Sequence, residues 1–130
     1  AYEAKWAVDN GADEVDMVLN VGWLLEGADD AGREDIAAVV RASQGRCVKV
    51  ILETCYLDDS QIARACRLSV EAGAAFVKTS TGFGTGGATV GDACKVKASG
   101  GIHTAEEAAA MVEAGADRIG TSSGIAIVAG

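Results

Sequence analysis

The sequence has only one histidine, and its four cysteines form no Cys-x-x-Cys pair. Because zinc-type sites need clustered cysteine and histidine ligands, we expect no metal site. We expect no cofactor either. Acidic residues outnumber basic ones, for a net charge of −8, which argues against a nucleic acid partner. No apolar run approaches the roughly 20 residues that cross a bilayer, so no membrane association is expected. The length of 130 residues, with 49% hydrophobic residues, favours one soluble domain over residues 1–130. The cysteines are expected to be reduced thiols, as is typical of the cytoplasm.

One short phrase occurs three times along the chain, at residues 9–15, 71–77 and 113–119. Each copy has a glycine where a helix would end, and an apolar strand begins a few residues later. Repeated helix–glycine–strand units predict an α/β fold with a parallel sheet covered by helices. The apolar patterns place strands at about 14–20, 47–53, 75–80, 94–98 and 117–121, and helices at about 1–10, 32–43, 58–72 and 104–114.

Two of these helices carry recognisable start signals. The helix at 58–72 has Asp58, Asp59 or Ser60 available as its N-cap. The helix at 104–114 opens with Thr104 followed by Glu107, the spacing of a capping box.

Charged and polar side chains collect at the predicted strand ends, where parallel βα folds bind their ligands. Lys78 and Lys97 each lie near the end of an apolar strand. Because burying a charged lysine costs free energy, a lysine at such a position usually has a functional or structural role. Two neighbouring cations favour loss of a proton from one of them, and the neutral amine is a nucleophile. The alternative is that both lysines form structural ion pairs. The strand-end residues are Asp16, Asn20, Lys49, Glu53, Lys78 and Lys97.

Asp16 interrupts an apolar strand, so its carboxylate should face the interior of the fold or a partner. One expected role is to relay protons or to bind a substrate hydroxyl, and the other is to be the structural partner of Lys49 or Lys97. Lys49 and Glu53 are four residues apart on one strand, so a structural ion pair between those two is also expected.

Two glycine-containing loops follow the last two strands. Gly100-Gly101 precedes the helix at 104–114, and Gly120-Thr121-Ser122-Ser123-Gly124 follows the final strand. Bare backbone N–H groups near a helix start favour phosphate binding, although two ordinary turns would have the same composition. His103 is expected to be a solvated loop residue or a phosphate contact. The connection at 81–93 has five glycines and no helical pattern, which predicts an irregular crossover or a lost helix.

Five stretches resemble the deoxyribose-phosphate aldolases, which are class I aldolases of deoxynucleoside breakdown. They lie at residues 11–18, 48–54, 76–82, 96–102 and 118–123, in family order through nearly the whole chain. The resemblance implies an α/β fold of the (β/α)8 TIM-barrel type. It also implies a lyase that reversibly cleaves a small phosphosugar, 2-deoxy-D-ribose 5-phosphate, to D-glyceraldehyde 3-phosphate and acetaldehyde without a metal.

The resemblance assigns roles to individual residues. Lys78 matches the lysine that forms the Schiff base, and Lys97 matches the neighbouring lysine that promotes loss of its proton and joins a proton relay. Asp16 matches the aspartate that works with both lysines and orients the substrate. A protonated imine withdraws electrons from the carbon beside it, so the C–C bond can break to an enamine. The matches to phosphate-binding positions are Gly82, Gly100, Gly101, Gly120, Ser122 and Ser123.

Three departures from the family pattern leave an alternative open. The family has strands before the position of Ala1, so about three of the eight strands are expected to be absent. It has a helix between the positions of Val90 and Val96, where only five residues remain here. His103 occupies a position that is often arginine. An incomplete barrel has open edges, so the alternative is an inactive fragment that at most binds a sugar phosphate or a partner chain, such as another copy of itself.

A further hypothesis is a different phosphate-binding barrel enzyme. The pairing of Lys78 with Lys97 disfavours it, because such an enzyme would not need an amine nucleophile beside a second cation.

Overall fold

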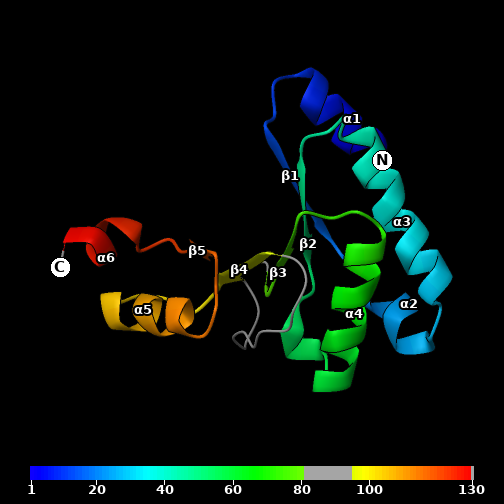
Figure 1. Cartoon of the computed structure of the whole chain (residues 1–130). Helices are drawn as coiled ribbons and strands as arrows, with labels where there is room; N and C mark the ends of the chain where they lie inside the picture. Colours follow the sequence, from blue (N-terminus) through cyan, green and yellow to red (C-terminus); the bar gives the residue numbers. More distant parts are fainter. Residues whose placement is uncertain (81–94, 130) are drawn as a thin grey trace.

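The protein is built on a parallel sheet of five strands, which follow one another across the sheet in chain order (Figure 1). The computed structural model describes residues 1–80 and 95–129. All five predicted strands are confirmed, and four of them are shorter than expected. They are β1 (Glu14–Val18), β2 (Cys47–Ile51), β3 (Phe76–Lys78), β4 (Lys95–Ser99) and β5 (Arg118–Gly120). The predicted loss of a helix between β3 and β4 falls on residues outside the described ones.

The four predicted helices are also confirmed, within a few residues at each end. They are α1 (Tyr2–Asp9), α3 (Asp29–Ala42), α4 (Asp59–Glu71) and α5 (Ala105–Glu113). Two short helices, α2 (Val21–Glu26) and α6 (Gly124–Ala129), and a 3-10 turn, η1 (Thr54–Tyr56), were not expected from the sequence. Among the described residues, no helix is long and apolar enough to cross a membrane.

Caps and left-handed glycines fix where the elements begin and end. Asp58 caps α4 and Thr104 caps α5, each in a reciprocal capping box. The glycine of each repeated phrase has a positive φ, +97° at Gly11, +88° at Gly73 and +100° at Gly115, where a side chain would be strained. Each such turn ends one helix and directs the chain into the following strand.

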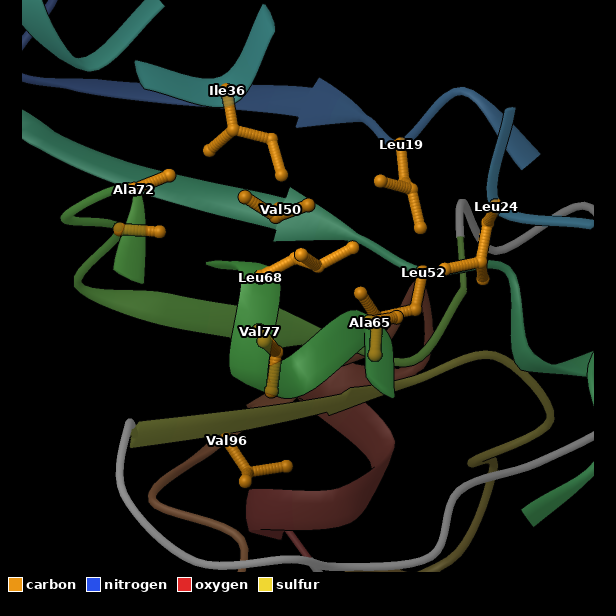
Figure 2. Close-up of a cluster of buried hydrophobic side chains, with 11 residues drawn as sticks. Leu19, Leu24, Ile36, Val50, Leu52, Ala65, Leu68, Ala72, Val77 and Val96 are labelled. Carbon is orange, nitrogen blue, oxygen red and sulfur yellow. The ribbon is translucent and has the colours of Figure 1, made fainter. Parts of the chain in front are cut away.

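Figure 2 shows buried side chains of β2, β3 and β4 in one cluster with side chains of the helices. Val50 of β2 is fully buried, and it lies in one cluster with Ile36 of α3 and Leu68 of α4. α1, α3 and α4 lie along one side of the first three strands (Figure 1). A separate, smaller cluster of Ala98, Ile102, Ala108 and Ala116 joins β4 to α5. The helices therefore cover one face of the sheet.

Candidate active site

The face of the sheet opposite the helices carries charged side chains. Successive side chains of a strand point to opposite faces of the sheet. Met17 and Val50 pack in the core beneath the helices, so their neighbours Asp16 and Lys49 lie on the opposite face. The strand registers place Asp16 opposite Lys49 and Lys78 opposite Lys97. The residues of this face include Glu14, Asp16, Lys49, Phe76, Lys78, Lys97, Arg118 and Gly120.

Asp16 lies between two lysines. Its Oδ1 accepts a hydrogen bond from the Nζ of Lys49 at 3.0 Å, and its Oδ2 accepts one from the Nζ of Lys78 at 3.2 Å. Partial burial raises the pKa of Asp16, but the hydrogen bonds from Lys49 and then Lys78 outweigh this effect and hold it below the ordinary value. Asp16 is therefore an ionised carboxylate that touches the predicted nucleophile.

Lys49 is the most deeply buried charge of the site, with 2% of its side chain exposed. Its Nζ donates to Glu14 Oε2 at 2.7 Å as well as to Asp16. Burial lowers the pKa of Lys49, yet hydrogen bonds to Glu14 and Asp16 more than compensate and raise it. The expected pair of Lys49 with Glu53 was wrong. The prediction assumed that the strand continues to Glu53. β2 ends at Ile51, and Glu53 has a φ of +53°, so Glu53 is not on the same strand face as Lys49.

Lys97 lies on β4, and the end of its side chain lies beside Gly120 of β5. A Cβ atom added to Gly120 would lie 3.0 Å from Lys97 Cε and 3.0 Å from Ser99 Cβ. Among the described residues, Asp16 forms ion pairs with Lys49 and Lys78 and not with Lys97. Of the two structural partners considered for Asp16, the structure therefore shows Lys49.

The ends of β3 and β4 are fastened to each other by buried hydroxyl groups. Thr79 Oγ1 and Ser80 Oγ donate to the carbonyl of Ser99 at 3.1 and 2.7 Å, and Ser99 Oγ donates to the carbonyl of Ser80 at 2.9 Å. These bonds hold the strand carrying Lys78 against the strand carrying Lys97, directly after the two lysines.

The loops after β4 and β5 lie side by side. Thr121 Oγ1 donates to the carbonyl of Ile102 at 2.6 Å, and His103 Nδ1 lies 3.4 Å from Ser123 Oγ. Gly100 and Gly101 have φ values of +92° and +70°, a pair of left-handed turns that suits glycine. Ser122 is exposed in the second loop. Of the predicted phosphate-binding residues, Gly82 lies outside the described part of the chain.

Two charged residues of this face, Glu14 and Arg118, were not predicted as site residues, and the prediction for Asn20 was wrong. Glu14 bridges Lys49 and Arg118, and Arg118 Nη1 donates to it at 2.7 Å. The alternation of side chains along β1 would have placed Glu14 beside Asp16, two residues away. Asn20, which was grouped with the strand-end residues, instead caps α2, since its Oδ1 accepts from the N–H of Trp23.

No group of three or more histidine, cysteine, aspartate or glutamate side chains in residues 1–80 and 95–129 is arranged to hold a metal ion.

The sequence profile of the DeoC/LacD family of aldolases matches residues 1–130. The chain belongs to this aldolase family. A deoxyribose-phosphate aldolase of Carboxydothermus hydrogenoformans is 56% identical over 144 aligned positions that include the whole chain. This chain spans 63% of the length of that relative. Because the alignment is longer than the 130-residue chain, this family member also lacks internal positions that the relative has.

Solved structures of other aldolases share the fold of this family member. The deoxyribose phosphate aldolase of Aeropyrum pernix, described as a unique tetrameric structure, is similar with a TM-score of 0.85 and 35% identity. The match covers 98% of this chain and 58% of that one. QR15, an aldolase, matches with a TM-score of 0.92 and 43% identity, over 98% of this chain and 62% of its own. The predicted resemblance and the incomplete TIM-barrel fold are thus confirmed.

Proposed function

We propose that this chain carries the Schiff-base site of an enzyme that reversibly cleaves 2-deoxy-D-ribose 5-phosphate to D-glyceraldehyde 3-phosphate and acetaldehyde. The observation that carries the proposal is the contact of Lys78 Nζ with Asp16 Oδ2, on a strand whose neighbour places Lys97 opposite Lys78. The 56% identity to a deoxyribose-phosphate aldolase supports this substrate. Because the chain spans 63% of that relative, turnover itself has to be measured.

Lys78 is the proposed nucleophile. Its neutral amine adds to the C1 aldehyde of the open-chain sugar, and loss of water gives a protonated imine. The imine withdraws the electron pair of the C2–C3 bond, which breaks to leave an enamine on Lys78. The C3 hydroxyl loses its proton and becomes the aldehyde of D-glyceraldehyde 3-phosphate. A proton then adds to C2, and water releases acetaldehyde from the lysine.

Asp16 and Lys97 are the proposed proton-transfer groups. The Asp16 carboxylate already accepts a hydrogen bond from Lys78, so it lies where it can orient a substrate hydroxyl and accept its proton. Lys97 lies opposite Lys78 in the register, and its ammonium group disfavours a second charge on the neighbouring amine. The three groups together supply the nucleophile, the base and the cation that the reaction needs.

The proposed phosphate site is formed by the two adjacent loops, through Gly100, Gly101, Gly120, Ser122 and Ser123, together with Gly82. The contacts Thr121–Ile102 and His103–Ser123 support it, because they hold both loops at one end of the sheet. Backbone N–H groups of left-handed turns are suited to bind anions. The substrate phosphate would lie there while its C1 carbon reaches Lys78.

Reductive trapping tests the nucleophile. Incubation with acetaldehyde and sodium borohydride should place an ethyl group on Lys78, identified by mass mapping of peptides, with exposed Lys5 as the reference for non-specific labelling. Lys78→Arg should abolish that adduct and turnover, and Lys97→Met should slow formation of the adduct. A folded chain that shows no excess labelling of Lys78 over Lys5 would contradict the proposal. Full turnover by Lys78→Ala would instead favour a different barrel enzyme.

We also propose that the chain associates with further copies of itself and acts in the cytoplasm. The tetrameric description of the Aeropyrum pernix relative supports self-association, and the free thiols of Cys47, Cys55 and Cys66 suit a reducing compartment. Light scattering after gel filtration and cell fractionation test these two statements. A monomer at high concentration would contradict the first, and a secreted product the second.

A further inference from the structure

Four ion pairs join five side chains of alternating charge in one row across the charged face of the sheet. The row runs Arg118, Glu14, Lys49, Asp16 and Lys78. The successive N–O distances are 2.7, 2.7, 3.0 and 3.2 Å. Glu14 and Asp16 lie on β1, Lys49 lies on β2 and Lys78 lies on β3. Arg118 of β5 links to Glu14 of β1, although these are the two outer strands of the sheet. The row therefore reaches across the charged face of the sheet and ends on Lys78, the proposed nucleophile.

Lys49 is the central link of this row. With 2% of its side chain exposed, it has almost no water to stabilise its charge, so the charge depends on Glu14 and Asp16. The two carboxylates take separate N–H donors of the same ammonium group. Asp16 in turn divides its two oxygens between Lys49 and Lys78. The negative charge that acts on Lys78 is therefore shared with a buried cation.

We propose that Lys49 is a positioning residue that fixes Asp16 and limits how much of its negative charge acts on Lys78, with Glu14 and Arg118 setting the charge balance of Lys49. The inference deepens the proposed function, since it matters for catalysis only if Lys78 is the nucleophile. Each charge of the row is partly neutralised by its neighbour in the row. Removing a cation of the row should therefore stabilise the positive charge on Lys78, and removing an anion should destabilise it.

Lys78 also has neighbours that do not belong to the row. Lys97 of β4 lies opposite it in register, and Ile51 of β2 is the apolar residue in register on its other side. Two residues earlier on β3, the ring centroid of Phe76 lies 4.6 Å from Arg118 Cζ and 5.8 Å from Lys95 Nζ. Glu53 follows β2 in a buried position and has an interaction of its own. Of the residues around Lys78 named in this paragraph, only Arg118 belongs to the row, and only Arg118 is altered by the substitutions below.

The row predicts opposite effects for cations and anions. Lys49→Met frees Asp16 to pair with Lys78 alone and removes a nearby positive charge, so Lys78 should hold its proton to higher pH, by about one unit. Arg118→Met should act in the same direction by a few tenths of a unit, because Glu14 then neutralises Lys49 more fully. Glu14→Gln should act in the opposite direction by about half a unit, since an uncompensated Lys49 draws Asp16 away.

The experiment measures the reactivity of Lys78 across pH by labelling the whole chain with a trace of an acylating reagent and quantifying the Lys78 peptide by mass spectrometry. Only the neutral amine reacts, so the midpoint of labelling reports its protonation without any turnover. Asp13 and Arg46 provide matched controls, because they form an exposed ion pair of 3.0 Å outside the row. Asp13→Asn and Arg46→Met should move the midpoint by less than about 0.2 unit.

Opposite shifts for Lys49→Met and Glu14→Gln, with unmoved controls, support the proposal even if the chain forms no Schiff base. Equal midpoints in all variants, or shifts of one sign, overturn it even if acetaldehyde is trapped on Lys78. If Lys49→Met does not fold, Arg118→Met and Glu14→Gln decide alone, since their side chains are 45% and 40% exposed and tolerate substitution. A purely structural role for the row would change the free energy of unfolding of these variants without moving the labelling midpoint of Lys78.

Discussion

Substitution of Gly120 by alanine tests whether the position of Lys97 matters for catalysis. Gly120→Ala adds one methyl group, and the backbone there needs no left-handed turn, so the change is steric rather than conformational. The new Cβ would lie 3.0 Å from Lys97 Cε and 3.0 Å from Ser99 Cβ. Ser99 is buried and bonded to Ser80, so the end of the lysine side chain is the part that can move.

The size of the effect follows from this geometry. Carbon atoms in contact are usually about 3.5–4.0 Å apart, so Lys97 Cε must retreat by about 0.5–1 Å. Displacement of a catalytic group by ~1 Å can cost about 10²-fold in rate, and we expect kcat to fall by about 10- to 100-fold. The free energy of unfolding should fall by ~1–3 kcal/mol from overpacking, partly offset by ~0.4–1 kcal/mol from the stiffer unfolded chain.

The assay compares 2-deoxyribose 5-phosphate with 2-deoxyribose. A displaced Lys97 should lower kcat for both sugars by similar factors, because the damage lies at the reacting carbon. If Gly120 only contributes to phosphate binding, KM for the phosphorylated sugar should rise and the other sugar should be unaffected. Ser122→Ala is the control for a phosphate contact alone, since Ser122 is exposed in the same loop. Unchanged kcat for both sugars in a folded Gly120→Ala protein would refute the reasoning.

Three further predictions concern stability, each measured by urea unfolding. Hydrogen bonds, first from Lys49 and second from Arg118, lower the pKa of Glu14 from 4.5 to about 2. The ionised Glu14 therefore stabilises the folded chain above pH 4.5, and this stabilisation is lost as the pH falls towards 2. Glu14→Gln should flatten that acid limb, and an unchanged limb would contradict the assignment. Asn20→Ala should cost ~1 kcal/mol through loss of the α2 cap, whereas Asn20→Asp should retain stability. Ile36→Val, at a side chain 1% exposed, should cost ~0.5–1.5 kcal/mol, and no loss would mean that the cluster around Val50 repacks freely.

The strands and main helices were predictable because their signals are local. Apolar runs bounded by Gly11, Gly73 and Gly115 marked where helices end and strands begin, and each of these glycines has the positive φ that the pattern requires. Thr104 and Glu107 form the predicted capping box of α5, and Asp58, one of three predicted candidates, is the N-cap of α4. α2 was missed because six residues give too short a pattern to show helical periodicity.

The partners of the charged residues were less predictable, since they depend on which strands are neighbours. Register alone pairs Asp16 with Lys49, and no sequence spacing indicates that Arg118 reaches Glu14 from 104 residues away. The expected Lys49–Glu53 pair was wrong because a strand was extended beyond its last paired residue. Lys78 and Lys97 were identified correctly as neighbours, because parallel strands that follow each other in sequence commonly lie side by side.

The two hydrophobic clusters meet within β4, since Val96 packs with α4 and Ala98 packs with α5. Lys97 lies between them, on the opposite face of the strand. Separately packed clusters commonly open as separate units in native-state hydrogen exchange. The amide protons of β2 should therefore exchange more slowly than those of β5, whose paired residues are few. A transient opening of the α5 unit would loosen the packing behind β4, which carries Lys97, so the reactive geometry would exist only while both units are closed.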